Sequence, residues 1–250
     1  MLARQRHRII LNMLSSQASL RTIELAKYFE VTDETIRRDL EQLDEEKKLI
    51  RTHGGCIRIE KGTGNLPLNK RLLQNHNLKC EIAKKALEMI KENDTLLFDA
   101  SSTALVLAEM LPDIRLTVIT NAHDIVLAVM DKTNITVILT GGRLDRESHS
   151  FGGFASWQAV RRYSVDLFFF SCNGVDIDRG ASEAAEMHAE FKENVLPFCS
   201  KKVLLCDSSK LNARSISYFA PLDKIDVLVT DSAASPEALQ PFESAGVKVV

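Results

Sequence analysis

The strongest constraint on how this chain folds is a strand–helix rhythm that begins at residue 78 and runs to the end. Seven short apolar segments alternate with stretches whose apolar residues recur at helical spacing. Short buried strands separated by helices are typical of a parallel sheet covered on both faces. Residues 78–250 are therefore predicted to form a doubly wound, mostly parallel α/β domain, with strands at about residues 95–99, 116–120, 135–140, 167–171, 202–207, 226–230 and 247–250.

Residues 1–60 follow a different rhythm of three helices and a hairpin. Apolar residues repeat at helical spacing near Ile9 and again between residues 23 and 29, and Thr32 is a suitable N-cap for a third helix. Gly54 and Gly55 then stand between two alternating runs, which indicates a hairpin. This order predicts a winged helix-turn-helix whose third helix enters the major groove of DNA.

The segment 61–77 contains Gly62, Gly64 and Pro67 and is predicted to be a linker. Two domains also agree with the length, because 250 residues correspond to about two domains of roughly 100–200 residues each. A formal net charge of −2 and 45% hydrophobic residues exclude a disordered chain and a collagen-like repeat.

The cysteines and the N-terminal residues indicate the cellular compartment in which the protein works. The five cysteines are odd in number and none forms a C-x-x-C pair, which disfavours a disulfide framework and a zinc ribbon. The N-terminus lacks a signal peptide, and no apolar run approaches the roughly 20 residues of a membrane span. We expect a cytoplasmic protein that binds no membrane, metal or cofactor.

The third predicted helix separates into a buried and an outward side. Ile36, Leu40 and Leu43 share one stripe, whereas Arg38 falls about 200° from Ile36. Thr35 and Gln42 lie close to Arg38, so these three are candidates for base-edge contacts, since Arg pairs with guanine and Gln with adenine. Arg37 is expected to reach a phosphate or to pair with Glu41. The further candidate DNA contacts are Thr22, Thr32, Arg51, His53 and Arg58.

The bland alternative for this helix is a merely solvated charged face. Residues 1–57 carry 10 Lys+Arg against 9 Asp+Glu, and Asp33, Glu34 and Glu41 lie near the predicted reading face. Basic surfaces supply most of the affinity for DNA, and this segment has almost equal numbers of basic and acidic residues. Periodicity alone therefore supports a DNA-binding helix and a solvated surface helix equally.

The order of residues 31–40, followed by Leu43 and residues 51–55, strongly resembles the DNA-binding domain of the DeoR family of bacterial transcriptional regulators. The resemblance implies that the third helix contacts an operator. The family usually places Gly just after this helix, where this chain has Lys47 or Lys48. A longer or mildly strained helix is therefore expected here.

Small polar or charged groups follow six of the predicted strands. In open α/β sheets ligands bind beyond the carboxyl ends of the strands, so these groups predict a pocket for a small, hydroxyl-rich, anionic ligand. Hydroxyls that open a helix suit phosphate, glycines permit close approach, and lysines supply charge. The candidates are Asp99, Ser101, Ser102, Thr103, Asn121, Gly141, Gly142, Asn173, Asp176, Lys192, Asp207 and Lys210.

Each candidate also has an ordinary structural role. A hydroxyl before a helix is usually an N-cap, paired glycines after a strand are usually a turn, and Asp176 with Lys192 can be a structural salt bridge.

Residues 67–231 resemble the effector domain of the same family. The motifs include Lys79, residues 99–103, Gly141-Gly142, residues 173–176 and residues 207–210. The resemblance implies a fold shared with ribose-5-phosphate isomerase and binding of phosphorylated sugars or related metabolites. Two departures stand out, because Ser101 replaces the usual Gly and Gly180-Ala181-Ser182 replaces the usual Gly-hydrophobic-Thr.

The favoured function is a repressor of a carbohydrate-metabolism operon, acting as a homodimer or homotetramer that its ligand releases from double-stranded operator DNA. One alternative is a sugar-phosphate isomerase in which Asp176 and Lys192 act as acid and base. We expect no catalytic residues, since the sequence has no nucleophile elbow and no carboxylate pair with an obvious partner base. The other alternative is a redox sensor that uses Cys56 or Cys172.

Overall fold

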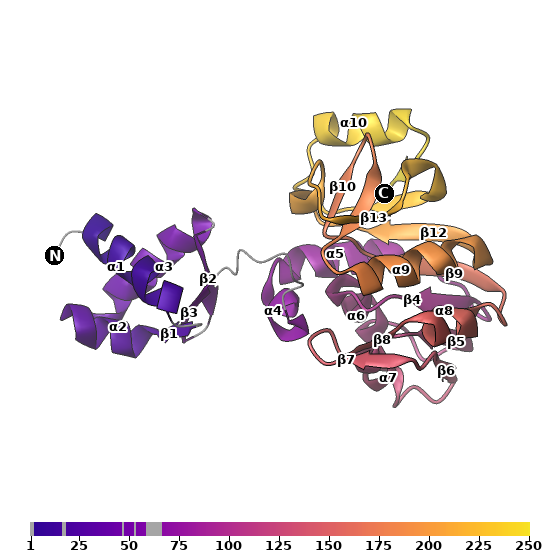
Figure 1. The fold of residues 1–250 in the computed structure, drawn as a ribbon, viewed down its shortest axis with the longest axis horizontal. Helices are drawn as coiled ribbons and strands as arrows, with labels where there is room; N and C mark the ends of the chain where they lie inside the picture. The colour runs from indigo at the N-terminus through magenta and orange to yellow at the C-terminus, as the bar shows by residue number, and fades with distance from the viewer. Residues whose placement is uncertain (1–2, 17–18, 47, 53, 59–66) are drawn as a thin grey trace. The chain divides into compact units, whose positions relative to one another are not determined.

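The structure is a computed structural model that describes residues 3–16, 19–46, 48–52, 54–58 and 67–250 (Figure 1). The chain divides into two compact units, Met1–Gly62 and Thr63–Val250. Helices and strands in both units follow the two rhythms of the sequence, so the α/β fold class with an N-terminal winged helix-turn-helix is confirmed.

The first unit packs three helices against a three-stranded antiparallel sheet of order β1-β3-β2. The short strand β1 is absent from the sequence-based prediction, because three residues are too few to show a period. The pairing of β1 with β3 explains why residue 55 is glycine, because a Cβ at this position would lie 2.0 Å from the carbonyl oxygen of Leu20. The elements are α1 (Ala3–Ser16), β1 (Ser19–Arg21), α2 (Thr22–Phe29), α3 (Asp33–Glu45), β2 (Leu49–Thr52) and β3 (Gly55–Arg58).

The ends of α3 are defined by local hydrogen bonds. The Thr32 hydroxyl accepts the backbone N–H of Thr35 at 3.3 Å, so the predicted N-cap is confirmed. The helix ends at Glu45, and the Lys48 N–H donates to the Leu43 carbonyl at 2.9 Å. The helix is therefore not longer than usual, because this backbone bond closes it. The other expectation, mild strain at Lys47, falls outside the described residues.

The second unit is built on a seven-stranded sheet of order β15-β14-β12-β9-β4-β5-β6, in which every described pair is parallel. The seven predicted strands are confirmed, with ends that differ by at most three residues. They are β4 (Thr95–Phe98), β5 (Leu116–Thr120), β6 (Ile135–Leu139), β9 (Val165–Phe170), β12 (Cys199–Leu205), β14 (Val227–Val229) and β15 (Lys248–Val249).

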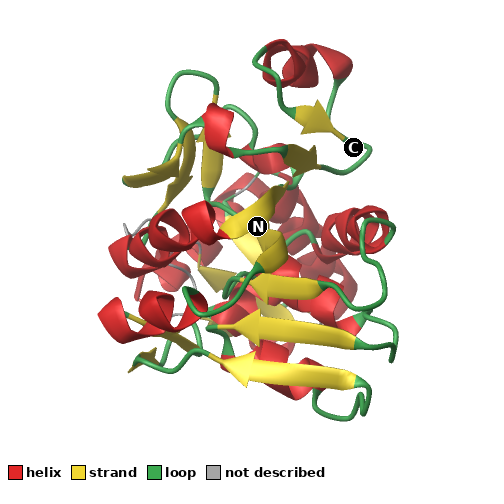
Figure 2. Cartoon of the chain, turned by 90° about the vertical axis from the view of Figure 1, so that its right-hand side faces the viewer, coloured by secondary structure: helices red, strands yellow, loops and turns green. Residues whose placement is uncertain are grey.

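Helices cover both faces of this sheet, as Figure 2 shows. Leu96 and Phe98 of β4 belong to one buried cluster and Leu97 to the other, because successive side chains of a strand point to opposite faces. One cluster packs under α5 (His76–Leu87), α6 (Ser102–Glu109) and α7 (His123–Val129), and the other includes residues of α9 (Glu186–Val195) and α10 (Pro236–Ser244).

Several short elements escaped the sequence-based prediction. Strands β7 (Arg143–Asp145) and β8 (Ser150–Gly152) form a hairpin before α8 (Phe154–Val160). A second antiparallel sheet contains β10 (Gly174–Asp176), β11 (Gly180–Glu183) and β13 (Ser217–Ala220). Single-turn 3₁₀ helices cover Leu196–Phe198, Ser208–Lys210 and Leu222–Lys224.

The predicted linker 61–77 is too long. Residues 61–66 lie outside the described residues, but α4 (Leu68–Leu73) is a helix and α5 begins at His76. Leu68 is buried and its N–H donates to the Glu147 carbonyl at 3.1 Å, so α4 belongs to the second unit. Among the helices described, none is long and apolar enough to cross a bilayer.

Candidate functional site

Helix α3 presents an outward face to solvent. Ile36, Leu40 and Leu43 are buried, as the helical wheel predicts. Arg38 points away from them, and its side chain is 77% exposed. This arrangement leaves the guanidinium of Arg38 accessible to the edge of a base.

Acidic neighbours moderate the charge of this face. Glu34 lies 3.5 Å from Nε of Arg38 and 4.0 Å from Nη1 of Arg37. Glu41 instead pairs with Arg51 at 3.1 Å. Arg51 lies on β2, one strand of the predicted wing. The predicted Arg37–Glu41 pair is therefore wrong, because Arg51 occupies that carboxylate. Exposed ion pairs contribute only about 0–1 kcal/mol each, so a phosphate or a base can displace them.

The remaining candidate DNA contacts are placed unevenly. Thr35 and Thr32 lie at the start of α3, where their hydroxyl oxygens are 3.0 Å apart. The exposed Gln42 donates to Glu46 at 3.1 Å. Thr22 is buried, and its N–H donates to the Gly54 carbonyl, next to β3, at 2.8 Å. This hydrogen bond connects the start of α2 to the β2–β3 hairpin, and the burial of Thr22 does not favour a DNA contact. His53 and the side chain of Arg58 lie outside the described residues.

A buried ion-pair cluster that the sequence analysis missed holds α3 to α1. Asp39 accepts hydrogen bonds from Arg6 at 2.6 and 3.1 Å and lies 3.0 Å from Nε2 of His7. The hydrogen bond to Asp39 raises the pKa of Arg6. Asp39 falls on the apolar side of the helical wheel, and that mismatch was the available signal. The cluster fixes the orientation of the reading helix.

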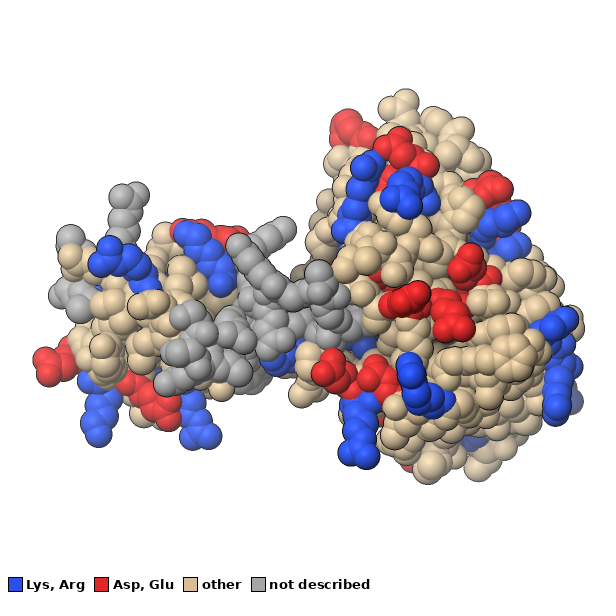
Figure 3. Space-filling view, viewed as in Figure 1, with Lys and Arg blue, Asp and Glu red and all other residues tan. Residues whose placement is uncertain are grey.

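Charge is spread over the first unit. On the face drawn in Figure 3, Lys and Arg side chains stand in separate groups with Asp and Glu between them. Sequence preference comes from contacts to base edges, and the described side chains on this face form no continuous basic surface that would add non-specific affinity.

In the second unit, polar side chains follow four adjacent strands. Asp99 follows β4, Asn121 follows β5, Ser171 follows β9 and Asp207 follows β12 by two residues. The sheet order β12-β9-β4-β5 makes these four strands neighbours, and all are parallel. Their carboxyl ends therefore meet at one edge, which is the predicted position of a ligand.

Lys192 lies at the centre of this edge and is 1% exposed. Its ammonium is 2.9 Å from Asp99 and donates to the Ser171 carbonyl at 2.7 Å and to Glu183. Burial alone would lower the pKa of Lys192, but the carboxylates of Asp99 and Glu183 raise it. Lys192 is thus charged and fully engaged with protein groups.

Lys210 is engaged in a similar way. Its ammonium lies 3.5 Å from Asp207 and 3.3 Å from the Ser171 hydroxyl. Burial pushes the pKa of Lys210 down and that of Asp207 up, yet their attraction reverses both effects. Asn75 also donates to Asp207 at 3.1 Å. The two lysines predicted to hold an anion are therefore already neutralised.

The hydroxyl loop opens α6 as expected. Ser101 is the N-cap, and its hydroxyl accepts the Ala104 N–H at 3.2 Å, so the serine that replaces the family's glycine has a structural role. Ser102 and Thr103 are buried. Oγ1 of Thr103 and Oδ1 of Asn121 are shielded from solvent and have no hydrogen-bond partner among the described residues. Buried polar atoms are rarely left unpaired, so these two atoms indicate a place for a ligand.

Other candidates are structural. Asp176 accepts from Tyr218 at 3.0 Å and lies 3.4 Å from Arg214, so the predicted Asp176–Lys192 bridge is wrong, since Asp176 belongs to the antiparallel sheet. Burial raises the pKa of Asp176, but hydrogen bonds and Arg214 lower it overall. Asn173 accepts the Ala184 N–H at 3.1 Å.

The glycine pair after β6 has positive φ angles, 69° at Gly141 and 115° at Gly142. A Cβ on Gly142 would lie 2.6 Å from the Gly152 carbonyl oxygen, so this glycine allows the loop to approach β8. Nothing within 4 Å would meet a Cβ on Gly141. A packing role therefore accounts for Gly142 without a ligand.

Four residues at this edge were not among the sequence-based candidates: Arg71, Asp145, Glu183 and His188. Arg71 falls in the predicted linker, and the other three lie on the short strands β7 and β11 or on the buried side of α9. The pKa of His188 is lowered, chiefly by burial, so its imidazole is neutral. Burial raises the pKa of Asp145, but the Ser148 hydroxyl and neighbouring backbone N–H groups lower it overall.

Both cysteines named for the redox alternative, Cys56 and Cys172, are buried, which disfavours a role as an accessible reactive thiol. Burial raises the pKa of Cys56 to about 12. The hydrogen bond with the Cys172 thiol, together with burial, raises the pKa of Cys206. Thiols held protonated in this way react slowly, because the thiolate is the nucleophile.

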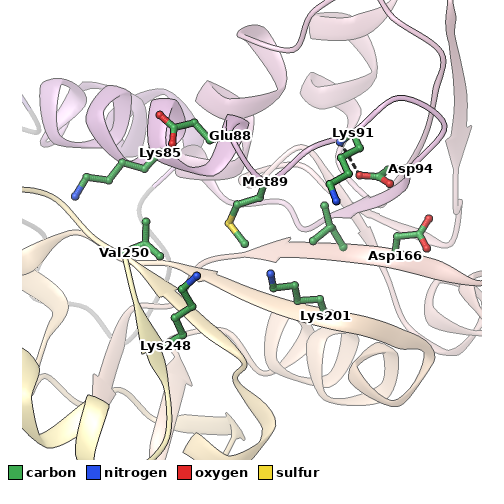
Figure 4. A pocket seen from close by; sticks show the side chains of 10 residues that line it. Lys85, Glu88, Met89, Lys91, Asp94, Asp166, Lys201, Lys248 and Val250 are labelled. Carbon is green, nitrogen blue, oxygen red and sulfur yellow. Dashed lines mark hydrogen bonds between the residues drawn. The ribbon is translucent and has the colours of Figure 1, made fainter.

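A separate pocket lies at the opposite edge of the sheet (Figure 4). Lys201 and Lys248 point into it from β12 and β15, and Lys91 and Asp94 line it beside the start of β4. Asp94 accepts the Lys91 N–H at 2.7 Å, which is an ordinary turn contact. Because ligands of open α/β sheets bind at the carboxyl edge, we assign no ligand to this pocket.

Comparisons with known proteins agree with both halves of the chain. Residues 6–62 match the DeoR-like helix-turn-helix domain family, and residues 74–232 match the DeoR C terminal sensor domain family. The chain is 38% identical to the uncharacterized HTH-type transcriptional regulator YulB of Bacillus subtilis, over 100% of this chain and 96% of that protein. It is 34% identical to the L-fucose operon activator of Haemophilus influenzae, over 95% of each.

Among solved structures, the ribose 5-phosphate isomerase A of Methanocaldococcus jannaschii overlaps 55% of each chain, with a TM-score of 0.42 and 17% identity. A similarity of this size carries no information about activity.

Proposed function

Because this chain belongs to the DeoR family of transcriptional regulators, we propose that it binds a specific operator through α3 and that a small metabolite at the carboxyl edge of the second unit controls this binding. The family consists of regulators and not of enzymes, so the isomerase alternative is set aside. The proposal rests on two features that occur together in one chain. Arg38 faces outward in the first unit, and buried polar atoms of Thr103 and Asn121 lack a hydrogen-bond partner in the described part of the second unit.

The proposed DNA contacts are made by α3. Arg38 and Gln42 reach base edges, Thr35 supports them at the start of the helix, and Arg37 and Arg51 contact phosphates. Each specific base contact contributes about 1–3 kcal/mol of discrimination.

The proposed effector is a phosphorylated sugar or a related metabolite, and the regulated genes serve carbohydrate metabolism. The name of the Haemophilus influenzae relative, an L-fucose operon activator, supports the carbohydrate assignment. Asp99, Asn121 and Thr103 are the proposed contacts to hydroxyl groups, since they line the edge with oxygen atoms.

Repression with release by the effector is the proposed mode of action, although that relative is named an activator. Repression requires only that the bound protein occupy the promoter, whereas activation also requires a contact with RNA polymerase. A chromosomal deletion combined with a reporter distinguishes the modes, because reporter expression rises when a repressor is lost and falls when an activator is lost.

A homodimer or homotetramer is proposed as the binding form, because operators are usually read at two half-sites about one helical turn apart or a multiple of it. Gel shifts with the DNA upstream of the gene test the proposal. We expect a sequence-specific complex that persists over excess unrelated DNA. Equal affinity for operator and unrelated DNA would contradict it.

A further inference from the structure

The guanidinium of Arg71 differs from the other cations at the carboxyl edge. Its Nε and Nη2 atoms are shielded from solvent and find no hydrogen-bond partner among the described residues. By contrast, Lys192 is engaged by Asp99 and Glu183, and Lys210 by Asp207. A buried donor without a partner destabilises the folded state, and a charged donor does so more strongly. Such an atom in a native protein calls for an explanation, such as a missing ligand.

Carboxylates surround Arg71 without pairing with it. Glu183, Asp99 and Asp145 raise the pKa of Arg71 through their charge, while burial lowers it by more. Each of these carboxylates has its own donor, since Lys192 contacts Asp99 and Glu183, and the Ser148 hydroxyl contacts Asp145. The site therefore contains a charged fork of N–H groups with no protein anion assigned to it.

His188 adds a second unpartnered atom to the same cluster. It is 5% exposed, and its Nε2 has no hydrogen-bond partner in the described part of the chain; the nearest carboxylate oxygen, on Asp145, is 3.9 Å away. The charge of Arg71 acts on His188 and helps to lower its pKa, so the two side chains share one electrostatic environment. They come from α9 and α4, far apart in sequence.

We propose that Arg71 binds the anionic group of the effector, with Nε and Nη2 donating to two oxygen atoms of one phosphate or carboxylate. This planar fork matches two oxygens of one group, which a lysine ammonium does not. The inference rests on the proposed sensor function and deepens it. It transfers the anion-binding role from Lys192 and Lys210, where the sequence placed it, to a residue of the predicted linker.

The location of Arg71 links the ligand to a particular helix. Helix α4 follows the connection from the first unit in sequence, and its end is held by Lys79, whose ammonium donates to the carbonyls of Arg71 and Gln74. An anion on Arg71 therefore binds to the helix that is nearest in sequence to the DNA-binding unit. Lys79 is therefore a positioning residue for Arg71.

The test uses the full-length protein, Arg71→Gln and the matched control Arg115→Gln. Arg115 is exposed and pairs with Glu92. Inorganic phosphate and acetate are titrated separately at constant ionic strength, with binding followed by thermal shift and calorimetry. We expect wild type and Arg115→Gln to bind at least one anion equally well, and Arg71→Gln to bind it at least about tenfold more weakly (about 1.4 kcal/mol).

The two anions identify the group that the site prefers. If the protein prefers phosphate, the anionic group of the effector is a phosphate ester, and if it prefers acetate, that group is a carboxylate. In either case, binding that depends on Arg71 supports the inference. Equal binding by wild type and Arg71→Gln, or no binding of either anion by wild type, would overturn it.

The stability of the ligand-free protein separates this role from a structural one. Without ligand, Arg71→Gln should be at least as stable as wild type, because an unpaired buried charge is removed; a purely structural arginine would give a less stable variant. If Arg71→Gln fails to fold, Arg71→Lys takes its place, and it should keep the charge but bind the anion more weakly than wild type. If ligand-free wild type does not bind the operator, the proposed function is contradicted. The dependence of anion binding on Arg71 would not be affected by that result.

Discussion

Single residues of α3 divide into side chains that face solvent and side chains that hold the fold. Arg38 and Asp39 are adjacent in sequence, yet the first points to solvent and the second is buried against Arg6. The helical period of α3 produces this division, since neighbouring residues lie about 100° apart on a helix.

Replacing Arg38 tests the proposed reading face. We expect Arg38→Ala to weaken binding to the operator by about 1–3 kcal/mol and to relax the preference at one base pair, because a bidentate base contact is lost. Binding to unrelated DNA should change far less. Competition gel shifts with singly substituted operators measure both effects, with Arg115→Ala as the control. An equal loss on all sequences would mean that Arg38 contacts only the phosphate backbone.

Lys79 predicts a pH dependence of stability. It is 3% exposed, and burial, with a contribution from Lys210, lowers its pKa to about 8 from 10.5. Between these two values the unfolded chain binds more protons than the folded one, so the free energy of unfolding rises with pH. Relative to Lys79→Met, wild type should gain up to about 3 kcal/mol between pH 8 and 10.5. Urea unfolding across this range measures the gain, and a difference independent of pH would refute the burial argument.

At the scale of elements, Lys192 joins parts of the chain that are distant in sequence. From α9 it reaches Asp99 after β4, the Ser171 carbonyl after β9 and Glu183 at the end of β11. A single ammonium therefore fixes the geometry of the candidate site at the carboxyl edge.

Removing that ammonium should be costly. Lys192→Met leaves Asp99 and Glu183 buried without their cation, and breaking a buried pair on one side costs about 3–5 kcal/mol. We expect a loss of this size in chemical denaturation. The triple variant Lys192→Met, Asp99→Asn, Glu183→Gln should recover part of the lost stability, because the unpaired charges are gone. A single variant as stable as wild type would show that the network contributes little.

Elements with a clear period were predictable, and short or irregular ones were not. The seven parallel strands and the stripe on α3 follow from repeated apolar residues, so the sequence alone indicates both. Strand β1 and the hairpin of β7 and β8 have three residues per strand, too few for a period. Their backbone hydrogen bonds depend on tertiary partners.

The candidate site at the carboxyl edge was only partly predictable for a related reason. Strand ends such as Asp99 and Asn121 can be located from sequence, because a parallel sheet gathers its carboxyl ends. Which cation is neutralised and which is left unpartnered depends on contacts between α4, α9 and β11. The sequence therefore indicated Lys192, while the three-dimensional arrangement points to Arg71.

Across the whole molecule, control of DNA binding by a ligand requires a coupling free energy between the two units. A ligand changes operator affinity only by the difference between its affinities for the two states, typically 1–3 kcal/mol. The linkage is reciprocal, so operator DNA must change effector affinity by the same factor.

The most direct test is operator affinity measured by fluorescence anisotropy with and without a phosphorylated sugar that stabilises the protein in a thermal-shift screen. A ligand at 100 times its Kd adds about 2.7 kcal/mol to stability, so the screen identifies it readily. We expect this sugar phosphate to weaken operator binding by about 5- to 150-fold in wild type, and much less in Arg71→Gln. An operator affinity unchanged by saturating ligand would contradict this expectation.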